Sequence, residues 1–338
     1  MAIPADTPAL PPPRGPLTSA LIHWLTAPAG DVPAGSAASQ ADPWGDDHQL
    51  ALYLCYELHY RGFAGVEPEL EWEPRLLDLR RSLERAFLDA VRDALGPVAS
   101  LQDQLDALLT EPLHGSGPSY HLLADGQRWQ AREYLAQRSL YHLKEADPQA
   151  WVIPRLHGAA QAALVAVEYD EYGAGRADRV HSLLFAQMMA DFGLDAAYGY
   201  YLPQASAEAL AAVNLMSLFG LHRALRGALV GQFAGVEITS SPGSHRLAGA
   251  LARLGAGPAG TRFYEEHVEA DAVHEQLMRH AVIGSLLKEE PQLEADVAFG
   301  LAAGTLVDDR LAAHLLTRWS ENRSSLIFPL DDGPATAL

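Results

Sequence analysis

Two histidines and an aspartate lie at helical spacing late in the chain: His267, Asp271 and His274. Because an α-helix turns about 100° per residue, Asp271 is rotated by about 40° from His267, and His274 by about 20° in the opposite sense. The three side chains should therefore point to one side of one helix on successive turns. Two imidazoles and a carboxylate at this spacing suit a divalent transition metal such as iron or manganese. An acidic helix with two surface histidines is the alternative.

A metal site on a helix needs further ligands from other helices, because neighbours on one helix cannot complete a coordination sphere. Glu171 would end a helix just before the Gly-Ala-Gly connector over 173–175, and His181 would lie on the second turn of the next helix. A tight reversal there could turn both side chains toward one core. Glu168, one turn before Glu171, competes with it as a ligand. A charged helix end followed by a loop explains the same residues without a metal.

Two more glutamates are candidates because of their surroundings. Glu237 follows 228–236, a nearly uncharged helical run, and a carboxylate in an apolar helix is costly unless it is paired, protonated or metal-bound. Glu145 follows the amphipathic stretch 139–144, so by itself it is better explained as a surface glutamate at a helix end.

Composition narrows the class of protein to which these residues belong. The net charge is −19, with only 24 Lys and Arg, which argues against nucleic acid or an anionic membrane as a partner. No stretch reaches the roughly 18 apolar residues of a membrane span, and 1–16 lacks the features of a signal peptide. The single cysteine, Cys55, excludes an intrachain disulfide framework and is expected to be packed in the core. We expect a cytoplasmic protein.

Helices must position the candidate ligands, since we find no convincing period-2 strand pattern. Capping residues, prolines and glycines mark their ends, with Asp46-Asp47 as one expected N-cap. The expected helices cover residues 46–62, 74–95, 97–109, 126–145, 149–172, 176–191, 206–235, 244–254, 258–287 and 291–320. A loop is expected over 112–118, and a short helix near 21–25 could dock on the rest. The predicted fold class is all-α.

The motifs together resemble the haem-oxygenase-like diiron oxidases and oxygenases, often called the iron-containing redox enzyme family. The resemblance covers about 128–320, and its most specific part is His-x3-Asp-x2-His. The Glu-x9-His pair of that family corresponds to Glu171 and His181, and two further family glutamates correspond to Glu145 and Glu237. The metal ligands that the resemblance implies are Glu145, Glu171, His181, Glu237, His267, Asp271 and His274.

The resemblance implies a seven-helix fold like that of haem oxygenase, without haem. The implied divisions are an arm over 1–45, an accessory helical segment over 46–127, the diiron domain over 128–325 and a tail over 326–338. It also implies an O2-dependent oxidoreductase with two iron ions that alternate between Fe2+ and Fe3+, with O2 as co-substrate and manganese as an alternative metal. A small-molecule substrate, a homodimer and a role for an external electron donor are expected, and no catalytic residue beyond the ligands is assigned.

The implied division of ligands places Glu145, His181 and His267 nearer one iron, and Asp271 and His274 nearer the other. Glutamates 171 and 237 would bridge or be shared. A set of seven ligands goes with family members that oxygenate nitrogen, so an amine, guanidine or amino-acid-derived substrate is expected. The alternative is an oxidase that desaturates, decarboxylates or cleaves an aliphatic or amino-acid substrate.

Other interpretations remain open at this point. A ferritin-like protein would use Asp178-x-x-His181 and Asp271-x-x-His274 in place of the usual Glu-x-x-His pairs. A metal-free helical enzyme or binding protein on the same fold would not need His267, Asp271 and His274 to be aligned on one side of a helix. A non-catalytic partner-binding protein is a third class. Outside the ligands, Tyr141, Asp170 and Tyr172 could orient histidine nitrogens, and Arg155 and Arg262 could anchor an acidic substrate. Ordinary core or surface roles are the alternative for all five.

Overall fold

The computed structural model describes residues 7–28, 32, 38, 40–110 and 115–331, without the side chains of Glu269, Asp271 and Ala272. Every regular element within those ranges is a helix, which confirms the all-α prediction. None of the helices in the described part of the chain is both long enough and apolar enough to cross a membrane.

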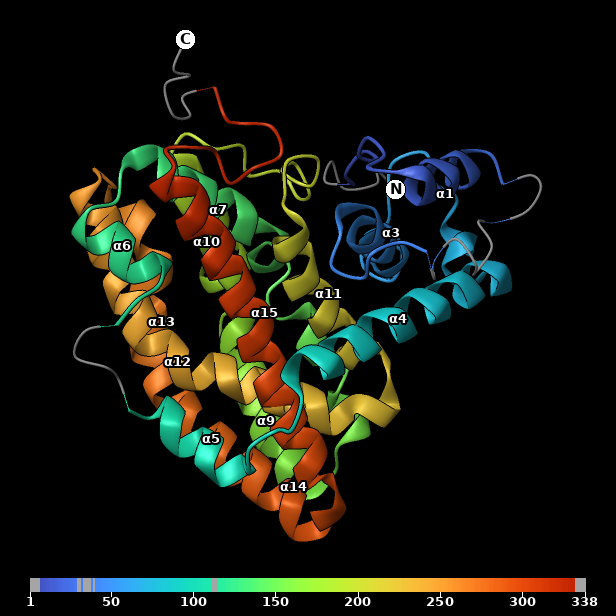
Figure 1. Ribbon diagram of the computed structural model, residues 1–338. Coiled ribbons are helices and arrows are strands. Elements are labelled where there is room, and N and C mark those ends of the chain that lie inside the picture. The colour runs from blue at the N-terminus through green and yellow to red at the C-terminus, as the bar shows by residue number, and fades with distance from the viewer. Residues whose placement is uncertain (1–6, 29–31, 33–37, 39, 111–114, 332–338) are drawn as a thin grey trace.

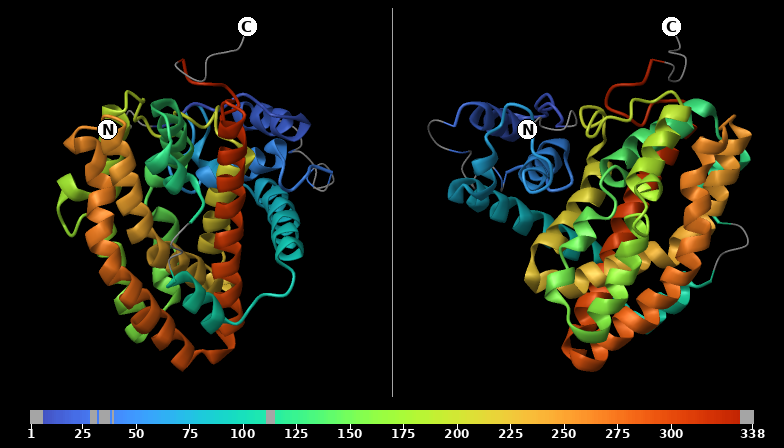
Figure 2. Two further views of the ribbon diagram at one scale, coloured as in Figure 1. Left: turned by 60° about the vertical axis from the view of Figure 1, so that its left-hand side comes forward. Right: turned by 180° about the vertical axis from the view of Figure 1, so that it is seen from behind.

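The N-terminal elements form one group on one side of the molecule (Figures 1 and 2). They are α1 (Pro16–Thr26), α3 (Asp46–Glu57), η1 (Pro68–Trp72) and α4 (Pro74–Leu95). The expected cap at Asp46-Asp47 is wrong, because Gly45 is the N-cap of α3. Asp47 instead accepts hydrogen bonds from the backbone amides of Leu17 and Thr18. It therefore stabilises the start of α1, where four amides lack helical partners.

The next two helices are short. They are α5 (Leu101–Leu108) and α6 (Pro118–Ala124). The helix expected from Pro97 begins later, because the side chain of Ser100 accepts from the amide of Asp103 and caps α5 there. The loop expected over 112–118 lies partly outside the described residues, which exclude 111–114, and Pro118 already belongs to α6.

The middle of the chain departs most from the expected helices. Its elements are α7 (Arg128–His142), α8 (Asp147–Ala150), η2 (Ile153–Arg155) and α9 (Gly158–Glu171). The single helix expected over 149–172 is therefore wrong. Pro154 lacks the amide hydrogen that a continuous helix needs, and Gly158 has a left-handed φ of 59°. The chain consequently turns before α9 begins.

The following elements carry most of the candidate ligands. They are η3 (Ala177–Arg179), α10 (His181–Asp191), α11 (Ala207–Leu221), η4 (Arg223–Leu225) and α12 (Arg226–Arg253). The helix expected over 206–235 is divided between α11 and α12. The separate helix expected over 244–254 is the second half of α12, which continues through Pro242.

The last elements are α13 (Pro258–Gln276), the π-helix η5 (Leu277–Ile283), α14 (Gly284–Glu289), η6 (Pro291–Leu293) and α15 (Glu294–Ser320). The expected helix over 258–287 is thus a helix with a π-helical section after its last candidate ligand. Wider π-turns of this kind are frequent at functional sites.

Helix α12 is central to the bundle, since it packs against both α13 and α15. Helices α12 and α15 cross one another (Figure 1), and their backbones approach closely at two glycines. A Cβ at Gly231 would collide with the carbonyl oxygen of Val297, and a Cβ at Gly300 would collide with that of Ala228. Only glycine permits this crossing, which fixes the part of α12 that precedes Glu237.

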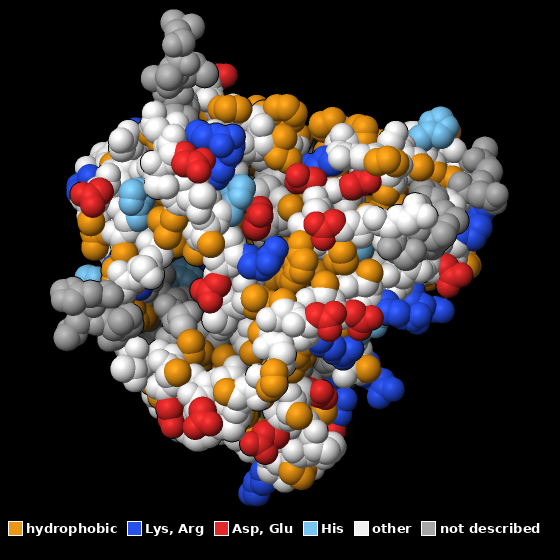
Figure 3. Space-filling view, viewed as in Figure 1, with side chains coloured by type: hydrophobic (Ala, Val, Ile, Leu, Met, Phe, Trp, Pro, Cys, Tyr) orange, Lys and Arg blue, Asp and Glu red, His pale blue; other side chains and the backbone are white. Residues whose placement is uncertain are grey.

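Charged side chains of both signs are interspersed on the face shown in Figure 3. The expectation that the protein has no nucleic-acid partner rests on the net charge of −19 and stays a prediction. Cys55 is buried in the core, as predicted.

Candidate metal centre

Buried histidines and glutamates from several helices converge inside the bundle. In one group, Glu145, Glu171, His181 and His267 each offer a ligand atom, and these atoms lie within 4.8 Å of one another. A second group with the same spacing consists of Glu171, Glu237 and His274. Glu171 belongs to both groups, so the two sets of donors adjoin.

Six of the seven candidate ligands are thus brought together. All six are buried, at 0–7% exposure. The side chain of the seventh, Asp271, lies outside the described residues, although its backbone belongs to α13. Glu168, the competing ligand, is buried on α9 but belongs to neither group.

A tight reversal between α9 and α10 brings Glu171 and His181 together. Gly173 has a φ of 81°, and a Cβ there would collide with the carbonyl oxygen of Arg176. Glu171 ends α9, while His181 is the first residue of α10 rather than on its second turn as expected. Its Nδ1 lies 2.7 Å from Glu171 Oε2.

His267 is oriented by its own helix. Its Nδ1 lies 2.7 Å from the carbonyl oxygen of Phe263, so a hydrogen on Nδ1 is donated to the backbone. The lone pair of Nε2 is then directed toward the cluster, with Nε2 3.9 Å from Glu145 Oε1. A hydrogen bond to the far nitrogen is the usual way in which proteins orient a metal-binding imidazole.

In His274 the roles of the two ring nitrogens are exchanged relative to His267. Its Nε2 lies 3.2 Å from Asp170 Oδ2, and its Nδ1 lies 3.0 Å from Glu237 Oε2 and 3.5 Å from Glu171 Oε1. A hydrogen on Nε2 donated to Asp170 leaves the lone pair of Nδ1 on the side of the two glutamates. Asp170 was one of three candidates for such a role. Tyr172 instead donates its hydroxyl to Asp147.

The electrostatics of the cluster favour a bound cation. Burial raises the pKa of Glu171, but the ion pair with His181 and the nearby His267 and His274 outweigh it, so the net pKa is lowered. Burial, reinforced by Glu171 and Glu237, raises the pKa of Glu168 to about 9. Neither carboxylate oxygen of Glu168 has a hydrogen-bond partner among the described residues.

Buried charges in proteins are normally paired or bound to metal. The contacts described above join the glutamates of the two groups to histidines, which can serve as neutral nitrogen ligands. Carboxylate oxygens with imidazole nitrogens form a donor set that suits iron or manganese. The residues therefore fit a metal, and beside them lies Glu168, whose pKa is raised chiefly by burial and further by Glu171 and Glu237.

Three further candidates from the sequence lie outside the cluster. Asp178 is exposed and pairs with Arg176 at 3.0 Å, so the ferritin-like Asp-x-x-His pair at 178–181 is not formed. Arg155 donates to the backbone oxygens of Gly220 and Leu221. Arg262 pairs with Glu266 on the surface of α13. Neither arginine lines the cavity described next, so both have structural roles.

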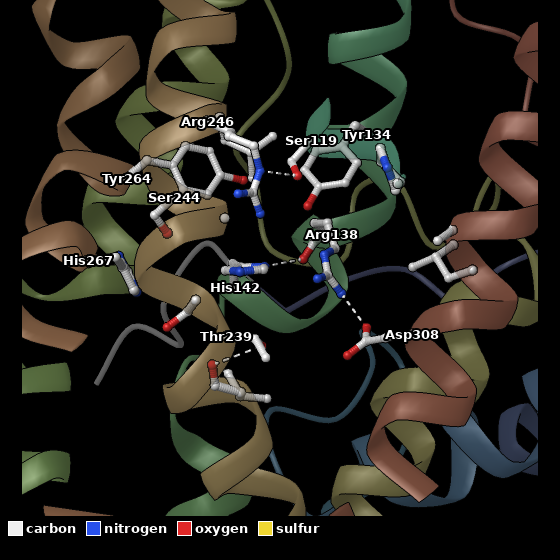
Figure 4. Close-up of a pocket in the computed structure, with 18 of the residues that line it drawn as sticks. Ser119, Tyr134, Arg138, His142, Thr239, Ser244, Arg246, Tyr264, His267 and Asp308 are labelled. Carbon is white, nitrogen blue, oxygen red and sulfur yellow. Dashed lines mark hydrogen bonds and ion pairs between the residues drawn. The ribbon is translucent and has the colours of Figure 1, made fainter. Parts of the chain in front are cut away.

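A cavity of about 370 Å³ opens beside the cluster and is lined by Glu145, Glu237 and His267 (Figure 4). Its other polar groups include Arg138 of α7 and Arg246 of α12. Sequence reasoning missed both arginines. The available signal for Arg138 was its position four residues before His142, which places both on one face of α7.

Comparisons with known proteins agree with this arrangement. A family profile described as an iron-containing redox enzyme matches residues 132–309, slightly more than half of the chain. A nitrosourea synthase from Streptomyces achromogenes subsp. streptozoticus is 28% identical over 218 residues, which cover 62% of this chain and 46% of that protein. The matched region thus spans just under half of the length of that relative. The chain belongs to the iron-containing redox enzyme family.

Proposed function

We propose that this protein is a non-haem diiron oxygenase that uses O2 to oxidise a nitrogen atom of a small molecule. The observation that carries the proposal is the pair of adjoining donor groups that share Glu171. One group alone would suit a single ion, whereas a carboxylate common to two groups suits two neighbouring ions, because its two oxygens can bind one ion each.

The proposed ligands combine the two groups with the family resemblance. Glu145, His181 and His267 would hold one iron, and His274 together with Asp271 would hold the other. Glu171, which belongs to both groups, would be shared, and the resemblance adds Glu237, a member of the second group, as a shared ligand. Manganese is the alternative metal, since it accepts the same nitrogen and oxygen donors.

The residues of the chain hold and orient the metals. When bound, two Fe(II) ions would supply electrons for the reduction of O2. The buried carboxylates place negative charge around the site and so stabilise the more highly charged oxidised ions. Phe263 and Asp170 keep the nitrogens of His267 and His274 aimed at the cluster. The adjoining cavity gives a small molecule access to Glu145, Glu237 and His267.

Oxidation of nitrogen is supported by the relative and by the number of ligands. The relative is a synthase of a nitrosourea, a compound class that contains an N–nitroso group. The proposed substrate is therefore an amine, a guanidine or an amino-acid derivative. We further expect a homodimer and a contribution from an external reductant, which analytical ultracentrifugation and turnover with and without added reductant would test.

The test begins with protein freed of metal and reconstituted anaerobically with Fe(II). We expect about two iron ions per chain, and O2-dependent conversion of one compound in an amine and amino-acid panel. With isotopically labelled O2, the product should carry a labelled oxygen on nitrogen. A product that has lost hydrogen or carbon instead would favour the oxidase alternative, and absence of iron binding would contradict the proposal altogether.

His267→Ala should reduce the bound iron from about two ions to one per chain, because it removes a nitrogen donor from only one group. His157→Ala is the matched control, since His157 is exposed, pairs with Glu289 and belongs to neither donor group. Iron content measured by a colorimetric chelator would decide. Retention of both ions in His267→Ala would contradict the ligand assignment.

A further inference from the structure

A second hollow of the molecule is a groove of about 330 Å³ along α15, away from the donor groups. It is lined by Glu208 of α11 and by Arg310, Ala313, His314, Thr317 and Arg318 of α15. Side chains four residues apart on an α-helix are neighbours on one side of it. Arg310, His314 and Arg318 therefore form a row of basic side chains that faces the groove.

The histidine of this row is already paired within the chain. Its Nε2 lies 2.8 Å from the carbonyl oxygen of Ser325, and its Nδ1 lies 3.4 Å from Glu208 Oε2. Both neighbours of the ring are hydrogen-bond acceptors. His314 and Glu208 thus satisfy each other, and Glu208 is the one carboxylate among the residues that line the groove.

The two arginines are held in place without being neutralised. In the described part of the chain, neither Arg310 nor Arg318 forms an ion pair with a carboxylate. The guanidinium carbon of Arg310 lies 4.0 Å from the centre of the Trp44 ring, and its Nε is buried without a hydrogen-bond partner there. Arg318 Nε donates to the carbonyl oxygen of Ser324 at 2.8 Å. An aromatic face and a neutral carbonyl fix the two guanidinium groups but leave both charges uncompensated.

Two uncompensated positive charges favour an anion that carries two negative charges. A phosphate monoester carries about 1.5 to 2 negative charges at neutral pH and has three strong acceptor oxygens, whereas a carboxylate carries only one charge. Thr317 lies between the two arginines along α15 and lines the same groove. Its hydroxyl has no hydrogen-bond partner among the described residues, so it is available as a third donor.

We propose that this groove binds a phosphate group, either as free phosphate or as the monoester of a small molecule, through Arg310, Thr317 and Arg318. A guanidinium binds phosphate through two parallel N–H···O hydrogen bonds, which give both strength and orientation. The volume of about 330 Å³ lies within the range of small-molecule sites. The groove belongs to neither donor group, so the inference goes beyond the proposed function and does not depend on it.

The test is calorimetry on the metal-free full chain at pH 8, with the ionic strength held constant by chloride. Metal-free protein is used because bound iron would itself attract phosphate. Wild-type protein should bind inorganic phosphate and glycerol phosphate at least about tenfold more tightly than acetate. Arg310→Gln and Arg318→Gln should each weaken phosphate by about tenfold or more, since the loss of a charge-assisted hydrogen bond costs about that much. Tighter binding of glycerol phosphate would identify a monoester, and equal binding would identify free phosphate.

A control variant and a second measurement make the result specific. Arg323→Gln removes an exposed arginine that pairs with Glu321 and does not line the groove, so it should bind like the wild type. Because Arg310 lies over Trp44, phosphate should change the tryptophan fluorescence of the wild type, and Trp44→Phe should abolish that change. Circular dichroism would verify that the variants are folded.

The inference is overturned if acetate binds as tightly as phosphate or if neither phosphate compound binds. It is also overturned if Arg323→Gln weakens phosphate as much as Arg310→Gln does, because the binding would then reflect a general attraction of anions by surface arginines.

Discussion

Buried glutamates occur in two regions of this molecule, and their charges are balanced in two ways. Glu57, at the end of α3, accepts from Lys144 Nζ at 2.9 Å and from the Tyr198 hydroxyl at 2.8 and 2.9 Å. Lys144 itself lies 4.1 Å above the centre of the Tyr60 ring. The chain thus supplies its own cation for Glu57. In the candidate metal centre, the contacts of Glu171 and Glu237 run to His181 and His274.

The partners of the buried glutamates differ between the two regions, and this difference indicates which region would be stabilised by a bound cation. A fully buried Glu–Lys pair satisfies its charges internally, and it joins α3 to the segment that presents Glu145. The carboxylates of the candidate metal centre contact imidazoles, and the pKa of the adjacent Glu168 is raised, chiefly by burial and further by Glu171 and Glu237. Lys144 and Glu145 are neighbours in sequence, yet the first completes an internal pair and the second belongs to the candidate metal centre.

The largest expected effect comes from breaking the internal pair. Lys144→Met should lower the free energy of unfolding by about 3–5 kcal/mol, because it leaves the Glu57 carboxylate buried without a cation. The double variant Glu57→Gln with Lys144→Met should recover most of this loss, since it removes both charges. Urea denaturation of the metal-free protein would measure both. Lys288→Met is the control, because Lys288 is exposed on α14. Equal loss in the single and double variants would mean that the pair is not coupled.

The second prediction concerns a Glu-to-Gln substitution at Glu168, beside the candidate metal centre. The folded pKa of Glu168 is about 9, above its ordinary value of 4.5. Between these values the folded chain holds a proton that the unfolded chain releases, so stability is lost as the pH rises through this window. Glu168→Gln should therefore stabilise the metal-free protein at pH 8, where the two pKa values set an upper limit of about 5 kcal/mol, and have little effect at pH 5.

Denaturation of chelator-treated protein at both pH values would test the prediction for Glu168. Glu57→Gln should have the opposite sign at pH 8, because it leaves Lys144 without its carboxylate. If both substitutions destabilise the protein at pH 8 by the same amount, the proposed contrast between the two regions does not hold.

The smallest effect is expected at Asp170, the partner of His274 Nε2. Asp170→Asn should weaken one metal site by about 10–100-fold, the usual cost of changing a residue that orients a ligand. Stability of the metal-free protein should change little, because the Asp170 side chain is half exposed. Competition with a chelator of known affinity would resolve the weaker ion. Asp178→Asn is the matched control, since Asp178 is exposed and lies outside the cluster.

Sequence reasoning identified the candidate site better than the helix ends. Residues at helical spacing within one element, such as His267 and His274, could be related by geometry alone. The Glu171–His181 reversal could be anticipated because Gly173-Ala174-Gly175 marks a tight turn. Assignment of Glu145, however, depended on the family resemblance, because its position lies between α7 and α8, where periodicity gives no direction.

The errors in the fold have local physical causes. Pro154 and Gly158 interrupt the helix expected over 149–172, whereas Pro242 does not interrupt α12, because packing against α13 and α15 overrides the local preference. Of the two cavity arginines, only Arg138 had a signal in the sequence, its spacing from His142. The sequence does not distinguish Arg246 from Arg155. Only the packing of α6 on α12 shows that Arg246 lines a cavity.

The glycine crossing of α12 and α15 limits how this enzyme could acquire new substrates. Gly231 and Gly300 leave no room for a methyl group, and α12 carries both Glu237 and Arg246. Natural or laboratory evolution could reshape the cavity by exchanging side chains on α6 and α7. Any larger residue at the crossing would instead displace the helix that serves the donor groups. Side chains of α6 and α7 that line the cavity can therefore change during evolution, whereas selection would remove substitutions at Gly231 or Gly300.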